Sequence, residues 1–210
     1  MKYEVTPVTA YQQNCSLVIC ENTGHAALID PGGETERLLK NVAAKEIQLE
    51  KILLTHGHLD HVGAAAEIAA QLKIPIIGPH KEDAFWLNAL PQQAEMFGFA
   101  SLSAFQPDQW LQDNDSVSVG DLTFEVIHCP GHTPGHVIFY HENSKTAFVG
   151  DVLFKGSIGR TDFPKGDHDT LIHCIKNKLL PLGDDVTFVP GHGPQSTLGE
   201  ERLHNPFIKE

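Results

Sequence analysis

The sequence feature that most constrains the fold is the run THGHLDH at 55–61. It follows a short apolar β-type segment at 51–54 and precedes an alanine-rich amphipathic stretch, which indicates a strand, a turn and a helix in succession. A glycine-containing turn at a strand end can aim His56 and His58 to one side. It brings Asp60 and His61 to the other, so the run offers imidazole and carboxylate ligands for two neighbouring metal ions. The alternative, a capped helix start with surface histidines, explains the spacing less well.

Three further motifs follow predicted strands. The run CPGHTPGH at 129–136 supplies His132, in a loop that prolines stiffen and glycines allow to take unusual backbone angles. His136 in the same run stands at a strand start, and we expect it to support the ligands rather than bind metal. Asp151 and His192 follow two later β-type segments. Because α/β enzymes usually build their sites where strand ends meet at one rim, we expect the motifs to converge.

Predicted strands and helices alternate in two sets along the chain. Alternating or β-branched runs predict strands, and apolar residues at helical spacing predict helices. The two sets predict two sheets packed face to face with helices outside, which is an α/β sandwich of four layers. We find no linker or short repeat, so residues 1–210 are expected to form a single domain. Strands are expected at 3–8, 15–20, 25–29, 51–54, 74–78, 122–128, 137–141, 146–149 and 186–189, and helices at 34–44, 62–72, 169–180 and 198–203, with a glycine-rich loop at 152–167.

Residues 79–114 carry aromatic side chains without a clean period, and one or two short helices are expected there. Phe85, Trp86 and Phe97 in this segment either wall the site or form a small core of their own, and the second arrangement is the commoner one. Histidines outside the four motifs are interpreted as structural or surface residues.

The composition limits the partners of the chain. Its 13 histidines are an excess that a metal centre would explain. Fifteen basic against 27 acidic residues give a formal net charge of −12, which argues against nucleic acid and anionic membranes as partners. The first ten residues contain no apolar core of a signal peptide and no run reaches membrane-spanning length, which predicts a cytoplasmic protein. The four cysteines form no C-x-x-C pair and are expected to be reduced and mostly buried, and the oligomeric state is left open.

The four motifs, in this order and spacing, resemble those of the metallo-β-lactamase superfamily over nearly the whole chain. The chain is most similar to the glyoxalase II (hydroxyacylglutathione hydrolase) branch in its short bacterial form, through QNCS at 13–16, IDPGG at 29–33, GRTDFP at 159–164, GEER at 199–202 and NPF at 205–207. The resemblance implies the αββα metallo-β-lactamase fold and two divalent metal ions, zinc first, with iron or manganese as alternatives. Motif by motif, it assigns one ion to His56, His58 and His132, the other to Asp60, His61 and His192, and a bridging position to Asp151.

The same resemblance implies a hydrolase in which a hydroxide bridging the metals attacks a thioester, with Asp60 and Asp151 as catalytic residues. The expected substrate is a small glutathione thioester of the S-lactoylglutathione type, whose thiol leaves without a strong general acid, and the expected role is methylglyoxal detoxification. Only 18 residues follow His192, so the C-terminal helical domain of long glyoxalase II enzymes is not expected. We therefore expect Arg160 to bind a substrate carboxylate, with a salt bridge to Asp162 as the equal alternative.

Three other functions stay open at this point. Persulfide dioxygenases resemble this chain, including a G-R-T-D-F loop, and use one iron held by two histidines and an aspartate. A broad-specificity, lactonase-like metallo-hydrolase would use the same ligands. The alternative from another class is a non-catalytic metal-binding protein that kept the fold and lost the reaction.

Overall fold

The first half of the chain forms a five-stranded mixed sheet in the order β1-β2-β3-β4-β5. Its first three strands pair antiparallel, and the last two join in parallel. The computed structural model describes residues 1–209. The strands are β1 (Lys2–Val8), β2 (Gln13–Ile19), β3 (His25–Ile29), β4 (Gln48–Leu53) and β5 (Ile76–Ile77).

The second half forms a six-stranded sheet in the order β13-β12-β9-β8-β7-β6. Four consecutive strands make an antiparallel meander, and β12 then pairs in parallel with β9. The strands are β6 (Ser116–Val119), β7 (Leu122–His128), β8 (Val137–His141), β9 (Thr146–Gly150), β12 (Thr187–Pro190) and β13 (Ser196–Thr197), and a small hairpin joins β10 (Leu153–Phe154) to β11 (Ser157–Ile158).

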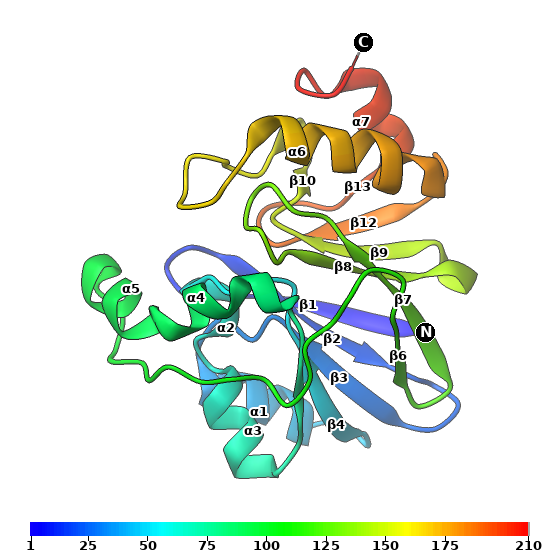
Figure 1. Ribbon diagram of the computed structural model, residues 1–210. Coiled ribbons are helices and arrows are strands. Elements are labelled where there is room, and N and C mark those ends of the chain that lie inside the picture. The colour runs from blue at the N-terminus through cyan, green and yellow to red at the C-terminus, as the bar shows by residue number, and fades with distance from the viewer. Residues whose placement is uncertain (210) are drawn as a thin grey trace.

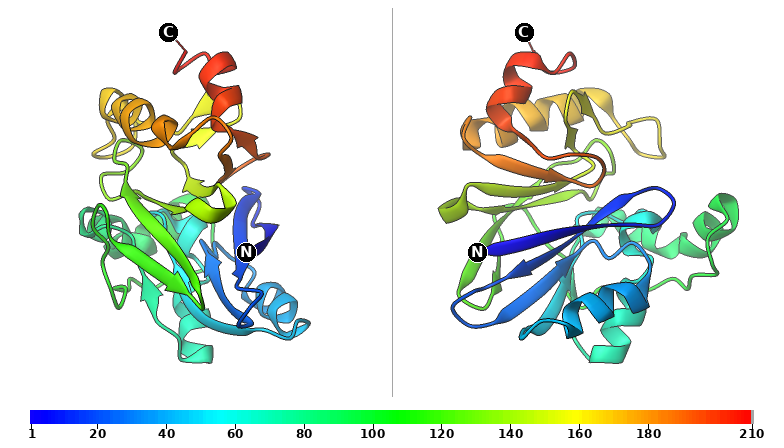
Figure 2. Two further views of the ribbon diagram at one scale, coloured as in Figure 1. Left: turned by 90° about the vertical axis from the view of Figure 1, so that its right-hand side faces the viewer. Right: turned by 180° about the vertical axis from the view of Figure 1, so that it is seen from behind.

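Helices cover the outer face of each sheet (Figure 1). α1 and α3 lie on the outer side of the first sheet and α6 and α7 on the opposite side of the molecule, as the turned views also show (Figure 2). The helices are α1 (Thr35–Ala43), α2 (Leu59–Val62), α3 (Ala65–Leu72), α4 (Ala84–Asn88), α5 (Leu90–Phe97), α6 (His168–Cys174) and α7 (Leu198–His204). Short 3₁₀ turns are η1 (Lys81–Asp83), η2 (Glu142–Ser144) and η4 (Leu180–Leu182), and η3 (Ile175–Leu179) is a π-helical turn.

Strand alternation divides the apolar side chains into three layers of core. In β8, Val137 and Phe139 point into the layer between the sheets, whereas Ile138 and Tyr140 point outward under the helices α6 and α7. This two-residue period is what a strand buried on both faces requires. The four-layer α/β sandwich predicted from the sequence is therefore the observed fold.

The structure corrects the expected elements in three places. The helix expected at 62–72 is two helices, because the backbone N–H of Ala64 donates to the carbonyl of Pro31 and the chain turns there. The loop expected at 152–167 contains the β10–β11 hairpin. The helix expected at 169–180 begins at His168, after the N-cap Asp167, and continues from Ile175 as the π turn η3.

The structure bears on two predictions made from the composition. All four cysteines are buried and free, as predicted. Within residues 1–209, no helix is both long enough and apolar enough to cross a lipid bilayer.

Candidate metal centre

Three histidines from two loops converge at the end of the first sheet. His56 and His58 lie in the turn after β4, and His132 lies in the loop between β7 and β8. The Nδ1 atom of His58 lies 3.1 Å from Nε2 of His56 and 3.0 Å from Nε2 of His132. All three side chains are buried, so the three ring nitrogens form a group that can hold one metal ion.

A second group lies beside the first and is more open to solvent. Asp60 and His61 lie in the one-turn helix α2, and His192 follows β12. The Oδ2 atom of Asp60 is 3.2 Å from Nε2 of His192 and 4.0 Å from Nε2 of His61. His61 is fully buried, whereas the side chains of Asp60 and His192 are 19% and 28% exposed, so solvent reaches the centre from this side.

Asp151, directly after β9, stands between the two groups. Its Oδ1 is 3.3 Å from Nε2 of His61, and its Oδ2 is 3.6 Å from Nε2 of His132 and 3.7 Å from Nε2 of His192. One carboxylate therefore faces ligands of both groups. The structure brings together all seven residues that the motifs single out.

Hydrogen bonds on the far side of two rings fix which nitrogen faces the centre. The Nδ1 atom of His132 lies 2.7 Å from the carbonyl oxygen of Arg160, and Nδ1 of His192 lies 3.1 Å from that of Tyr11. A carbonyl can only accept, so each ring donates from Nδ1 and leaves the lone pair of Nε2 for the centre.

Asp30 orients two further rings, those of His56 and His61, although the sequence marks it only as part of a turn. Its Oδ2 accepts from Nδ1 of His61 at 2.9 Å and from the hydroxyl of Thr55 at 2.6 Å. Because that hydroxyl donates to Asp30, it accepts from Nδ1 of His56 at 3.0 Å. Both rings therefore turn Nε2 toward the centre. The motif IDPGG contains Asp30, but only packing shows its partners.

Asn14 is a second residue whose part the sequence leaves unassigned. Its Nδ2 donates to the carbonyls of Pro190 and Gly193, and its backbone N–H donates to Gly191. These bonds attach the loop that carries His192 to the start of β2.

The surroundings keep the first group in the form that binds metal. Burial, followed by the neighbouring His132, lowers the pKa of His58 to about 3. Burial also lowers the pKa of His56 well below its usual range and that of His132 below its ordinary value. Neutral imidazoles at physiological pH carry the free lone pair that a ligand needs.

The carboxylates of the site are ionised and supply negative charge beside the imidazoles. Burial raises the pKa of Asp151, but His61 and His132 outweigh it and hold that pKa well below its usual range. Burial lowers the pKa of His61, yet Asp151 and Asp60 outweigh it and leave that pKa well above 6.5. The site thus holds ionised carboxylates among imidazoles, the donor set that suits zinc, iron or manganese.

Atoms without partners show that the donor set fits a metal pair. Nε2 of His61 and Oδ1 of Asp151 are buried and have no hydrogen-bond partner among residues 1–209. Buried polar atoms are costly unless something binds them, and both atoms face the centre. The residues present therefore fit two metal ions.

Comparison with known proteins agrees with this geometry. Residues 8–192 match the family described as the Metallo-beta-lactamase superfamily. The chain belongs to this superfamily. It is 49% identical over 209 residues to the hydroxyacylglutathione hydrolase GloC of Haemophilus influenzae. The aligned region covers 99% of this chain and 98% of GloC.

Two solved structures of the superfamily are similar over the whole fold. BLEG-1 B3 metallo-beta-lactamase has a TM-score of 0.91, 36% identity and full coverage of both chains. TTHA1623 in a di-iron-bound form has a TM-score of 0.89 and 37% identity over 98% of this chain and all of that one. Together with the buried histidine and aspartate clusters, these similarities make the protein a metallo-hydrolase of the superfamily, with clusters consistent with a dinuclear site.

The two remaining predicted site residues lie beside the superfamily's ligand groups. His136 stacks on His56 with ring centroids 4.7 Å apart, and its Nε2 accepts from the backbone N–H of Asp151 at 3.1 Å. It therefore supports the ligands from behind. Arg160 makes two bonds to Asp162, at 2.9 and 2.8 Å, which is the arrangement that was the alternative to substrate binding.

Aromatic side chains cover the first group. Trp86 in α4 meets His58 edge to face with centroids 4.5 Å apart, and Phe163 meets His58 at 4.9 Å and His132 at 5.7 Å. Phe85 next to Trp86 carries the ammonium of Lys165 4.3 Å above its ring. Trp86 thus walls the centre. Phe163 does so too, although the sequence marks it only as part of the GRTDFP run at 159–164.

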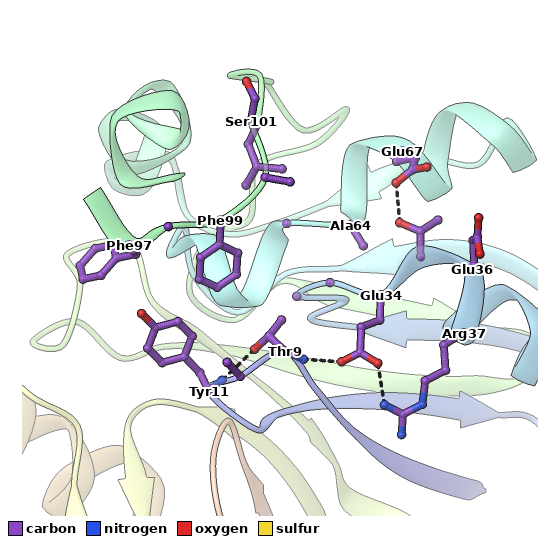
Figure 3. Close-up of a pocket in the computed structure, with 18 residues that line it drawn as sticks. Thr9, Tyr11, Glu34, Glu36, Arg37, Ala64, Glu67, Phe97, Phe99 and Ser101 are labelled. Atoms are coloured by element: carbon purple, nitrogen blue, oxygen red, sulfur yellow. Dashed lines mark hydrogen bonds and ion pairs between the residues drawn. The ribbon is translucent and has the colours of Figure 1, made fainter. Parts of the chain in front are cut away.

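A cavity of about 860 Å³ lies outside the ligand set (Figure 3). Phe97, Phe99 and Tyr11 border one end of it, and Glu34, paired with Arg37 at 2.7 Å, borders the other. Phe97 therefore lines this cavity and not the metal centre.

Proposed function

We propose that the protein hydrolyses the thioester of an S-acylglutathione, such as S-lactoylglutathione, to a hydroxy acid and free glutathione. The observation that carries the proposal is the complete pair of ligand groups with Asp151 between them, together with full-length similarity to GloC. Glutathione as the thiol rests on that similarity, and the reaction type rests on the donor set.

The chain's own residues prepare the reaction. Two divalent ions, when bound, lower the pKa of a shared water and polarise a carbonyl oxygen. His56, His58 and His132 would hold one ion, and Asp60, His61 and His192 the other, with Asp151 in contact with both groups. The rings are already turned to the required nitrogen, so little conformational entropy is lost when metal and substrate bind.

Substrate approaches from the side of Asp60 and His192, where the centre is open. Trp86 and Phe163 on the opposite side exclude water from the first group and offer an apolar wall for the acyl chain. A thiol with a pKa of about 8.5 leaves as thiolate, so no residue has to protonate it strongly.

Arg160 is the residue proposed for the substrate carboxylate. Its guanidinium lies 4.5 Å above the ring of Phe163, which covers the first ligand group, and its side chain is 68% exposed. An exposed ion pair contributes little stability, so a substrate carboxylate can replace Asp162 at small cost.

The test is the loss of thioester absorbance from S-lactoylglutathione by protein of known metal content. We expect kcat/KM of about 10⁴ M⁻¹s⁻¹ or more, lost on chelation and restored by added Zn²⁺. His132→Ala and Asp60→Ala should each abolish turnover. Arg160→Met should raise the KM for S-lactoylglutathione. The KM for a thioester without a carboxylate should not change.

Failure of metal-loaded protein to turn over the thioester would overturn the proposal. Oxygen uptake with glutathione persulfide would then indicate the dioxygenase alternative. Metal analysis of protein purified from cells distinguishes zinc, which we propose as the native metal, from iron or manganese.

A further inference from the structure

Asp83, at the end of η1, is a fully buried carboxylate that no predicted motif contains. Its Oδ2 accepts from the backbone N–H of Gly57 at 2.8 Å and from the hydroxyl of Thr133 at 2.8 Å. Its Oδ1 accepts from the backbone N–H of Gly135 at 2.6 Å. Burying a carboxylate is expensive, and three donors from two loops are what offset that cost here.

The two loops are those that carry the first ligand group. Gly57 lies between His56 and His58, and Thr133 follows His132 directly. One carboxylate therefore links the loop after β4 to the loop between β7 and β8. The ligands His58 and His132 on these loops are 74 residues apart in sequence, and their imidazoles must meet at one point.

The turn that holds Asp83 is itself attached to the second loop. The backbone N–H of His80 donates to the carbonyl of Gly135 at 3.0 Å, and the N–H of Asp83 donates back to the carbonyl of His80 at 3.0 Å. The carboxylate therefore cannot swing away without breaking these backbone bonds.

The two glycines make room for this arrangement. A Cβ at position 135 would lie 2.5 Å from the backbone nitrogen of Asp83 and 2.7 Å from its Oδ1. A Cβ at position 57 would lie 2.8 Å from Cβ of Trp86 and 3.2 Å from the carbonyl oxygen of Asp83. Glycine is required at both positions because the segment carrying Asp83 packs directly on each ligand loop.

We propose that Asp83 is a positioning residue that fixes His58 relative to His132 and so sets the metal affinity of the first group. Asp30 supports the ring of His61 directly and that of His56 through Thr55. The side-chain bonds of Asp83, in contrast, all end in the loops beside His58 and His132. Asp83 thus governs one metal of the pair. The inference rests on the metal centre and not on the substrate, so it stands or falls independently of thioester hydrolysis.

The test measures zinc affinity, by competition with a chelating dye, in two backgrounds. His192→Ala removes a ligand of the second group and leaves the first intact, and His132→Ala does the reverse. Asp83→Asn keeps the size of the side chain but places an amide N–H₂ against donors. We expect it to weaken zinc binding by about 10–100-fold in the His192→Ala background and to leave affinity in the His132→Ala background within about threefold.

Two further measurements keep the result decisive. Asp108→Asn is the matched control, because Asp108 accepts from the backbone N–H of Ile76 away from both loops and should alter neither affinity. The visible spectrum of bound Co²⁺ in the His192→Ala background should change with Asp83→Asn and not with Asp108→Asn. If Asp83→Asn fails to fold, Thr133→Val, which removes only the hydroxyl bond, should produce a smaller loss in the same background.

Equal losses in both backgrounds would overturn the proposal, because they would show a general loss of structure. Unchanged affinity in the His192→Ala background would also overturn it, whether found with Asp83→Asn or with Thr133→Val.

Discussion

His58 is held neutral by burial, and this makes the metal-free protein sensitive to acid. The ordinary pKa of 6.5 in the unfolded chain falls to about 3 in the fold, chiefly through burial and then through His132. A folded pKa below the unfolded one gives stability that is fully present above pH 6.5 and is lost as pH falls toward 3. At pH 5.0, which is 1.5 units below the pKa in the unfolded chain, His58 is protonated only when the chain is unfolded. The free energy of unfolding is therefore lower by about 2 kcal/mol.

The perturbation is His58→Asn, because asparagine cannot titrate. Unfolding of metal-stripped wild type and variant by urea is measured at pH 7.5, 6.5, 5.5 and 5.0. We expect the wild type to lose about 2 kcal/mol more than the variant between pH 7.5 and 5.0. Groups common to both proteins cancel in this difference, apart from the neighbouring imidazoles that interact with His58.

Two results would refute this reasoning. A difference that stays constant within about 0.5 kcal/mol over this range would mean that His58 has an ordinary pKa in the fold. A difference that changes in the opposite direction would mean that the carboxylates of Asp60 and Asp151 outweigh burial and keep the ring protonated.

Three other predictions concern stability. Asn205→Ala should lower the free energy of unfolding by about 3 kcal/mol, measured with urea, because its buried side chain donates to Glu201, Ser157 and Phe154 and accepts from Phe207; a loss below about 1 kcal/mol would contradict this. Phe124→Ala between the sheets should cost about 3–5 kcal/mol with the far-ultraviolet spectrum preserved, and a smaller cost would mean that the layer collapses around the cavity. Zinc at about 1,000 times its dissociation constant should stabilise by about 4 kcal/mol per site, so calorimetry should show a melting temperature that rises with free zinc.

Much of the fold could be predicted because its signals are local. Each strand of the two sheets needs apolar side chains at a fixed period, and β8 shows this period on both faces. The N-cap Asp167 could also be predicted, because a cap bonds to an N–H three residues away, here that of Thr170. The break between α2 and α3 could not, because it depends on a bond from Ala64 to Pro31, over thirty residues earlier.

The sequence alone determined which side chains are available as ligands and that they follow strand ends. His56, His58, Asp60 and His61 could be read from one short run, since a tight turn dictates which neighbours share a side. Their number and type already indicated two metal ions.

Only the tertiary structure decided how these ligands are held. Asp30 and Asp83 look like turn and helix-start residues in the sequence, yet their carboxylates fix His61 and the loops of His58 and His132. The physical reason is range. A ligand's identity belongs to one residue, but its orientation depends on hydrogen bonds between segments that become neighbours only when the two sheets and their loops pack together.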